Sequence, residues 1–200
     1  DAAERIDHLN RFLFDELGFA GNGDEYYDPR NSFLSSVMDR RRGIPITLSI
    51  LYIEIGRRLG LPLQGVSFPG HFLVILPVSH GAVVLDPYTE GASLELSDLE
   101  HLLSQADPDR HWESAPIRRL LEPADLRDIL VRMLRNLKAV YWRAKDPVNG
   151  VWVQDLLLGI DPDLAEERRD RGILREQMGH FSAALQDFSD YLRDVPDALD

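Results

Sequence analysis

The chain has 200 residues, of which 44% are hydrophobic and 28% are charged, so it is long enough for one globular domain of ordinary size or two small ones. Its net charge of −12 argues against nucleic acid or an anionic membrane as the main partner. Because the chain contains no cysteine, disulfides, thiolate metal sites and a catalytic thiol are excluded.

Helical patterns dominate the first third of the chain. Apolar residues at helical spacing predict a helix over 2–17 that ends before a glycine. A short second helix is predicted to end at Asp39, with Asn31 or Ser32 as its cap. A third helix, 45–59, begins with a proline, whose missing N–H costs nothing at the first helical position. This third helix is apolar at nearly every position in its first three turns, so we expect it in the centre of the domain.

Three segments rich in β-branched and aromatic residues follow, and short turns containing glycine separate them. They are 64–68, 71–78 and 82–85. Because the turns are tight, we expect an antiparallel meander. A short helix over 97–105 follows, with Ser97 as its cap.

The proline-rich segment 107–123 is the best candidate for a domain boundary, and it predicts domains at 1–120 and 121–200. Beyond it the pattern is helical, and the prolines at 162 and 196 are 34 residues apart, which is the tetratricopeptide period. Since each such repeat buries its apolar face on a neighbour, we expect two repeats either to dock on the first domain or to bind a partner.

The most informative candidate site combines His71 with Asp86. A helix N-terminus lowers the pKa of a nucleophile, a histidine on a nearby strand can accept its proton, and an aspartate can fix the tautomer of that histidine. His71 and Asp86 are separated by a tight hairpin, so facing strands can bring them together. The alternatives are a structural histidine at a strand start and an aspartate that only forms a strand-end turn.

The nucleophile that such a pair usually serves is missing. Thr47 and Ser49, in the first turns of the central helix, are the candidate replacements. The competing interpretation is structural, because serine and threonine in a buried helix usually bond back to a carbonyl one turn earlier.

A second candidate site is the cationic run Arg40, Arg41 and Arg42, together with Asn31. Beside a helix N-terminus, such a run can attract a carboxylate or a phosphate. The alternative is a solvated face paired with nearby acids such as Asp39. Glu54 is another predicted acidic partner. We expect no metal and no cofactor, because the remaining histidines lack metal-ligand spacing: His8, His80, His101, His111 and His180.

Several motifs resemble one bacterial family. They are RRRGIPITLSILYIEIGRRLGLPL, GVSFPGHFLV and LDPY, and the C-terminal stretch EERRDRGILREQMGHFSAALQDFSDYL. The chain is thereby identified as similar to the SirB-type transglutaminase-like proteins, in which a transglutaminase-like core precedes tetratricopeptide repeats. The resemblance implies an α+β, papain-like core with a central helix and an antiparallel sheet, followed by an all-α region. It also implies that Pro45 stands where the catalytic cysteine would be, and that His71 and Asp86 match the rest of the triad.

These observations predict a pseudoenzyme that acts as a protein-binding or regulatory module. Its protein partner would bind through the helical repeats or through the degenerate cleft. The alternatives are a cleft that binds a small anion, and an amide or ester hydrolase that uses Ser49 or Thr47. We expect a soluble, cytoplasmic protein, because the N-terminal helix is charged and the longest apolar run, 44–55, is too short to cross a membrane.

Overall fold

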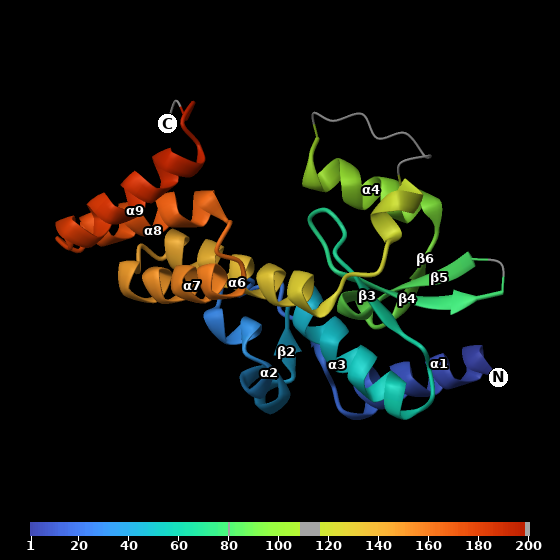
Figure 1. Ribbon diagram of the computed structural model, residues 1–200. Coiled ribbons are helices and arrows are strands. Elements are labelled where there is room, and N and C mark those ends of the chain that lie inside the picture. Colours follow the sequence, from blue (N-terminus) through green and yellow to red (C-terminus); the bar gives the residue numbers. More distant parts are fainter. Residues whose placement is uncertain (80, 109–116, 199–200) are drawn as a thin grey trace. The chain divides into compact units, whose positions relative to one another are not determined.

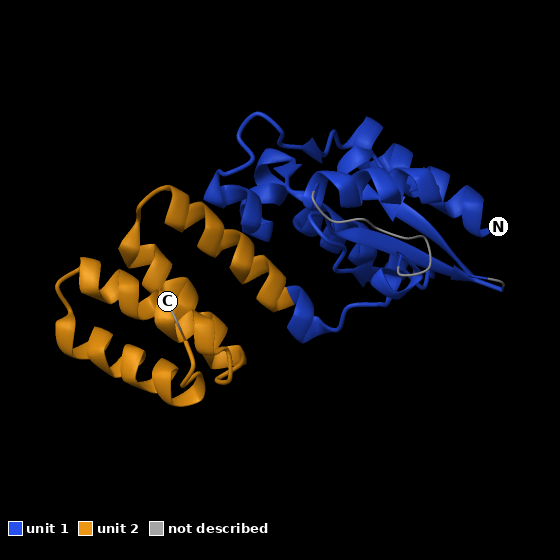
Figure 2. Cartoon of the chain, turned by 90° about the horizontal axis from the view of Figure 1, so that it is seen from above, with its two compact units in different colours: residues 1–129 blue, residues 130–200 orange. Residues whose placement is uncertain are grey.

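The computed structural model describes residues 1–79, 81–108 and 117–198, and the chain divides into two compact units. Unit 1 is Asp1–Ile129 and unit 2 is Leu130–Asp200 (Figure 2). The predicted boundary segment 107–123 lies partly outside the described residues, as do His80 and His111. Among the described residues, no helix combines the length and the apolar character that a membrane span requires.

Unit 1 combines helices with a small antiparallel sheet (Figure 1). Its helices are α1 (Ala2–Asn10), the π-helix η1 (Arg11–Glu16), the 3-10 helix η2 (Pro29–Ser32), α2 (Leu34–Arg40), α3 (Pro45–Arg58), the 3-10 helix η3 (Pro87–Thr89), α4 (Leu96–Ala106) and the 3-10 helix η4 (Arg118–Leu121). Its strands are β1 (Ala20–Gly21), β2 (Arg42–Gly43), β3 (Gln64–Val66), β4 (Leu73–Val78), β5 (Gly81–Asp86) and β6 (Ala92–Leu94).

The four longer strands form the predicted meander. Their order is β3-β4-β5-β6, and every neighbouring pair is antiparallel. β6 was not predicted, because a three-residue strand carries too little alternation to stand out in the sequence. β1 and β2 pair separately and in parallel, which joins the loop after η1 to the segment before α3.

The sheet separates two apolar clusters, because successive side chains of a strand point to opposite faces. Val74, Leu76 and Leu85 pack with side chains of α1 and α3, including Leu9 and Tyr52. Their neighbours along the strands pack with α4 in the second cluster: Leu73, Ile75, Val84, Leu99 and Leu103. α3 is therefore a central element of the core, as its apolar sequence predicted.

Two predicted helix caps are wrong. Asn31 and Ser32 belong to η2, and Phe33 is the residue that precedes α2. α4 begins at Leu96, so Ser97 lies inside its first turn. The helix begins one residue earlier than predicted, and the Asp98 carboxylate stabilises this start by accepting the backbone N–H of residue 95 at 2.8 Å.

Unit 2 is built from helices joined by short turns. α6 (Leu126–Arg143) carries the chain into this unit, and α7 (Pro147–Ile160), α8 (Ala165–Gln177) and α9 (Phe181–Asp194) follow. Small residues allow these helices to approach closely. A Cβ atom at Gly150 would lie 2.7 Å from Leu174, and one at Gly172 would lie 2.6 Å from the ring of Phe188. A larger side chain at either position would push neighbouring helices apart.

Candidate functional site

His71 and Asp86 form a hydrogen-bonded pair at one end of the β4–β5 hairpin. The Nε2 atom of His71 lies 2.9 Å from Oδ1 of Asp86. The ladder between the strands ends at Val74 and Leu85, so His71 lies in the turn before β4 and Asp86 is the last residue of β5. Both side chains are nearly buried, with exposed fractions of 12% and 4%. The contact is thus shielded from most of the solvent.

The surroundings fix the orientation of this pair. Oδ1 of Asp86 also accepts the backbone N–H of Tyr88 at 2.9 Å, which starts η3. The ring of Tyr88 stands edge-on to the His71 ring, with 5.9 Å between centroids. Burial and the charge of Asp86 raise the pKa of Tyr88 above its ordinary value. A carboxylate oxygen accepts hydrogen bonds, so in this contact Nε2 of His71 is the donor and Oδ1 of Asp86 the acceptor.

Pro45 is the first residue of α3 and is buried. Thr47 caps the N-terminus of this helix, because its Oγ1 accepts the backbone N–H of Ile44 at 3.1 Å. The same hydroxyl lies 2.9 Å from the carbonyl oxygen of Asn31 and 3.1 Å from that of Ile44, so its hydrogen is used within the backbone. Thr47 is also fully buried. Its position is that of a helix cap.

Ser49 joins α3 to the start of β4. Its side chain is fully buried, and its hydroxyl donates to the backbone carbonyl of Phe72 at 3.2 Å. Phe72 directly follows His71, so this bond helps to hold the chain at the His71–Asp86 pair. The single hydroxyl hydrogen of Ser49 is thus directed at a backbone carbonyl.

Asn31, which was predicted to take part in ligand binding, forms several hydrogen bonds inside the protein. It is fully buried, and its Nδ2 donates to the carbonyls of Glu25 (2.7 Å) and Tyr26 (3.2 Å). Its Oδ1 accepts from Nδ2 of Asn22 at 3.0 Å. The side chain therefore fastens the loop after β1 to the segment before α2, and its polar atoms are used inside the protein.

The three arginines do not act as one cationic cluster. The guanidinium of Arg40 lies 3.1 Å from Asp28 and 3.7 Å from Glu25. Arg42 donates to the carbonyls of Gly18 and Arg41. Arg41 itself ends α2 in the left-handed conformation, with φ of 56°.

The acidic partners predicted for this run are wrong. Asp28 and Glu25 take the place of Asp39, because the loop held by Asn31 carries them to Arg40. Glu54 pairs instead with Arg57, one turn along its own helix, at 3.4 Å. With Arg40 neutralised in this way, the arginine run offers less attraction for an anion than its sequence indicated.

Sequence reasoning identified the histidine and the aspartate but missed Tyr88, which contacts both. The signal was present in the LDPY motif, where the aspartate ends a strand and the next two residues begin a turn. Among the described residues, no group of three or more histidine, aspartate or glutamate side chains is arranged to hold a metal ion.

Comparison with known proteins identifies both parts of the chain. The profile of the Transglutaminase-like superfamily matches residues 1–135, and that of the Tetratricopeptide repeat matches residues 137–200. A UPF0162 protein of Xylella fastidiosa (strain Temecula1) is 47% identical over 193 residues, which are 94% of this chain and 67% of that protein. A UPF0162 protein of Vibrio cholerae is 31% identical over 201 residues, which are 98% of this chain and 72% of that protein.

A further similarity covers about two thirds of this chain and a small part of a much larger protein. Human F-box only protein 21 is 35% identical over 140 residues, which are 66% of this chain and 21% of that protein. No solved structure matches the chain significantly. The predicted α+β transglutaminase-like core and the predicted tetratricopeptide region are confirmed. The chain belongs to the transglutaminase-like superfamily, among the SirB-like UPF0162 proteins that carry a tetratricopeptide region after the core.

Proposed function

We propose that this protein is a non-catalytic transglutaminase-like protein that acts as a protein-binding, regulatory module. The observation that carries the proposal is Pro45 at the first position of α3, in a chain without cysteine. By resemblance to thiol enzymes of this fold, that position belongs to the nucleophile. A proline there supplies neither a nucleophile nor a backbone N–H for an oxyanion.

The neighbouring hydroxyls do not favour a hydrolase. A nucleophilic hydroxyl must present its hydrogen to the catalytic base, directly or through one water. The hydroxyls of Thr47 and Ser49 are fully buried and donate to backbone carbonyls instead. An anion-binding cleft is also less favoured, because Arg40 is already paired with two carboxylates.

Protein binding is supported by the surface of unit 2. Tetratricopeptide repeats generally present helix faces to other proteins. The helices of this unit leave several large apolar side chains more than a third exposed, which is typical of interaction surfaces. They are Trp142, Val148, Trp152, Leu156, Phe181, Leu185 and Leu192.

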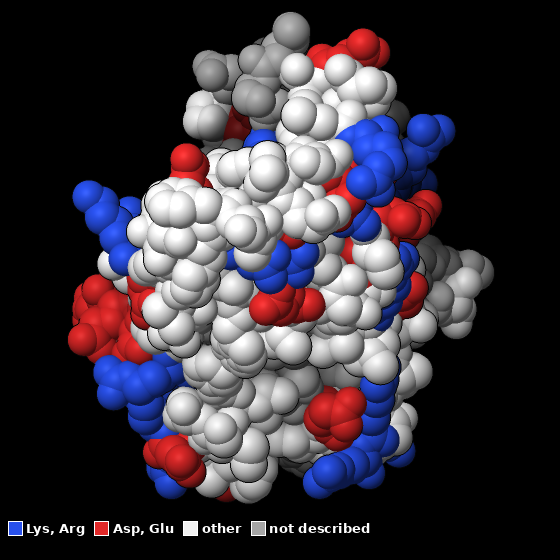
Figure 3. Space-filling model, turned by 60° about the vertical axis from the view of Figure 1, so that its left-hand side comes forward, with Lys and Arg blue, Asp and Glu red and all other residues white. Residues whose placement is uncertain are grey.

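The charge distribution fits a protein partner better than a nucleic acid. On the face drawn in Figure 3, acidic and basic side chains alternate among uncharged ones. Nucleic-acid-binding proteins instead gather lysine and arginine in a stripe or a patch. A net charge of −12 also repels a phosphate backbone.

The first test compares wild type with His71→Ala, and uses His8→Ala as the control because His8 is an exposed histidine of α1. We expect wild type neither to hydrolyse p-nitrophenyl acetate faster than the variants nor to react with serine-directed fluorophosphonates. We also expect all three proteins to capture the same partners from a lysate of the source organism. Hydrolysis or labelling that is lost only in His71→Ala would overturn the proposal.

The second test introduces a thiol with Pro45→Cys, which gives the chain its only cysteine. If position 45 is the nucleophile position beside His71, the imidazole lowers the pKa of this thiol, and alkylation by iodoacetamide at pH 7 becomes about tenfold slower when His71→Ala is added. Equal alkylation rates in the two proteins would show that Pro45 does not occupy the nucleophile position. The proposal would then lose its main support.

A further inference from the structure

A cavity of about 550 Å³ lies in unit 2, where α6 ends and turns into α7, beside the C-terminal end of α8. Binding pockets for drug-sized ligands have volumes of this order. Its apolar lining consists of Tyr141, Trp142 and Leu174. Trp142 is 43% exposed, whereas the other two are nearly buried. The cavity thus exposes the indole ring of Trp142 beside the nearly buried side chains of Tyr141 and Leu174.

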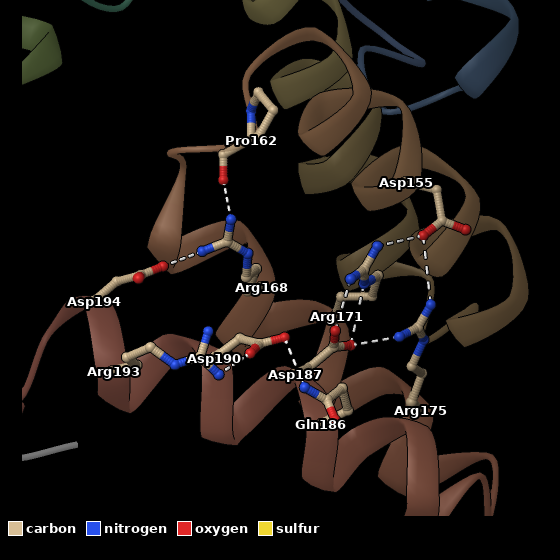
Figure 4. Close-up of polar contacts among 10 residues, drawn as sticks. All are labelled: Asp155, Pro162, Arg168, Arg171, Arg175, Gln186, Asp187, Asp190, Arg193 and Asp194. Carbon is tan, nitrogen blue, oxygen red and sulfur yellow. Dashed lines mark hydrogen bonds and ion pairs between the residues drawn. The ribbon is translucent and has the colours of Figure 1, made fainter.

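The lining also contains an unpaired cation, Lys145. Unit 2 pairs its other cations closely, as Figure 4 shows for Arg171 and Arg175, which share Asp187. Every other arginine and lysine among residues 130–198 has an interaction partner. Lys145 forms neither an ion pair nor a hydrogen bond through its ammonium group with any described residue. Its charge is available to a ligand.

The backbone of Lys145 is held in an unusual conformation. Its φ is 53°, in the left-handed region where glycine is preferred. Two hydrogen bonds close the end of α6 around it: the N–H of Lys145 donates to the carbonyl of Trp142 (3.1 Å), and that of Asp146 donates to the carbonyl of Tyr141 (3.0 Å). This is the Schellman arrangement, and the residue that it places at the cavity is a lysine instead of the glycine that the backbone favours.

The one carboxylate in the lining, that of Asp146, forms no ion pair with Lys145. Asp146 caps α7 and accepts both the backbone N–H (3.1 Å) and the Nδ2 (2.6 Å) of Asn149. These bonds hold the pKa of Asp146 below its ordinary value. Arg143 adds a second cation to the lining. The lining therefore carries two cations against one carboxylate, beside an aromatic and aliphatic wall.

We propose that this cavity binds an acidic peptide segment of a partner protein, with a carboxylate on Lys145 and a neighbouring apolar or aromatic side chain on Trp142. An ammonium group favours an anion, and the indole face favours an apolar neighbour of that anion. A peptide offers both within one short stretch, whereas a free inorganic anion uses only the first. The proposal rests on the proposed protein-binding function and names the surface that performs it.

The test uses the ¹⁵N-labelled full chain and the peptide acetyl-Glu-Leu-Glu-Phe-amide. We expect the indole N–H signal of Trp142, identified by its loss in Trp142→Phe, and the backbone amide of Lys145 to shift during titration. We expect Lys145→Gln to weaken binding about tenfold, since it removes a charge-assisted contact. Replacing both glutamates of the peptide by glutamine should weaken binding to a similar extent.

The control variant is Arg193→Gln, which removes the same charge from an exposed site on α9, outside the cavity lining. It should leave peptide binding unchanged. An equal loss in the control, equal binding of the glutamine peptide, or no shift at about 10 mM peptide would overturn the proposal. Equal shifts with acetate or inorganic phosphate would also overturn it, in favour of a small-anion site.

The two proposals can fail separately. If Lys145→Gln captures the same partners from a lysate as wild type does, the protein-binding function stands but this cavity is not its site. If hydrolytic activity is found and lost in His71→Ala, the non-catalytic function falls, whatever the peptide titration shows.

Discussion

Asp187 is the anionic centre of a buried ion-pair network in unit 2, and Asp187→Ala is expected to destabilise that unit strongly. Its oxygens accept from Arg171 at 2.6 and 3.1 Å and from Arg175 at 2.8 Å (Figure 4). The carboxylate is only 3% exposed. The network joins α8 to α9, so its loss should be felt in the packing of both helices.

The magnitude follows from what the variant leaves behind. Removing one partner of a buried ion pair costs about 3–5 kcal/mol, because the remaining charge is uncompensated. Here both arginines retain Asp155, at 2.7 and 3.6 Å, and they are 18% and 21% exposed. This residual pairing and solvation place the expected loss at the lower end, about 3 kcal/mol in the free energy of unfolding.

The assay is urea unfolding of the full chain at pH 7, followed by tryptophan fluorescence, because Trp142 and Trp152 report on unit 2. The matched control is Asp190→Ala, which removes a carboxylate on the same helix whose partner, Arg193, is largely exposed. It should change the midpoint little. If Asp187→Ala loses less than about 1 kcal/mol, or no more than the control, burial does not strengthen this network and the reasoning is refuted.

Three further changes test other parts of the molecule. Thr47→Val should lower the free energy of unfolding by about 2 kcal/mol, because the buried N–H of Ile44 loses its acceptor. Thr47→Ser keeps the hydroxyl and should retain most of the stability. If Thr47→Val leaves the free energy of unfolding in urea unchanged, Thr47 does not cap the helix. The hydrogen bond from the Arg30 side chain holds the pKa of Asp28 below its ordinary value of 3.8. The ionised Asp28 therefore stabilises the folded state above pH 3.8, and this contribution is lost as the pH falls through the lower pKa of the folded state. Asp28→Asn should therefore lose less stability than wild type during acid titration followed by circular dichroism, and parallel curves would count against the pair. Lys145→Gly should raise the free energy of unfolding by about 1 kcal/mol, because glycine adopts a φ of 53° without strain. A lower free energy of unfolding would mean that the lysine side chain stabilises the turn.

The sequence was most informative where one local signal decided the structure. The opening proline and the apolar run predicted α3 to within one residue of its observed end, Arg58. Segments rich in β-branched and aromatic residues, separated by tight turns, predicted the meander, and with it the approach of His71 to Asp86. Helix and strand periodicities depend on neighbouring residues, so they can be read without knowledge of the tertiary structure.

Predictions failed where the partner of a side chain was chosen by tertiary contacts. Nothing in the spacing of the arginine run indicates that Arg40 pairs with Asp28, because that contact depends on how Asn31 folds the preceding loop. The helix cap at residue 95 depends likewise on the Asp98 carboxylate, which accepts the backbone N–H of residue 95. Such side-chain bonds compete with equally plausible local alternatives, and the sequence alone does not rank them.

The loss of the thiol and the placement of the hydroxyls support the same interpretation of the core. For Ser49 to act as a nucleophile, its hydroxyl would first have to leave the carbonyl of Phe72, which would then be buried without a donor at a cost of about 1–3 kcal/mol. Thr47 faces the same obstacle, because its hydroxyl also accepts the N–H that opens α3. Both hydroxyls thus have structural partners in the backbone, that of Ser49 beside His71 and that of Thr47 at the start of α3. A catalytic role for either one would weaken the arrangement on which that role depends.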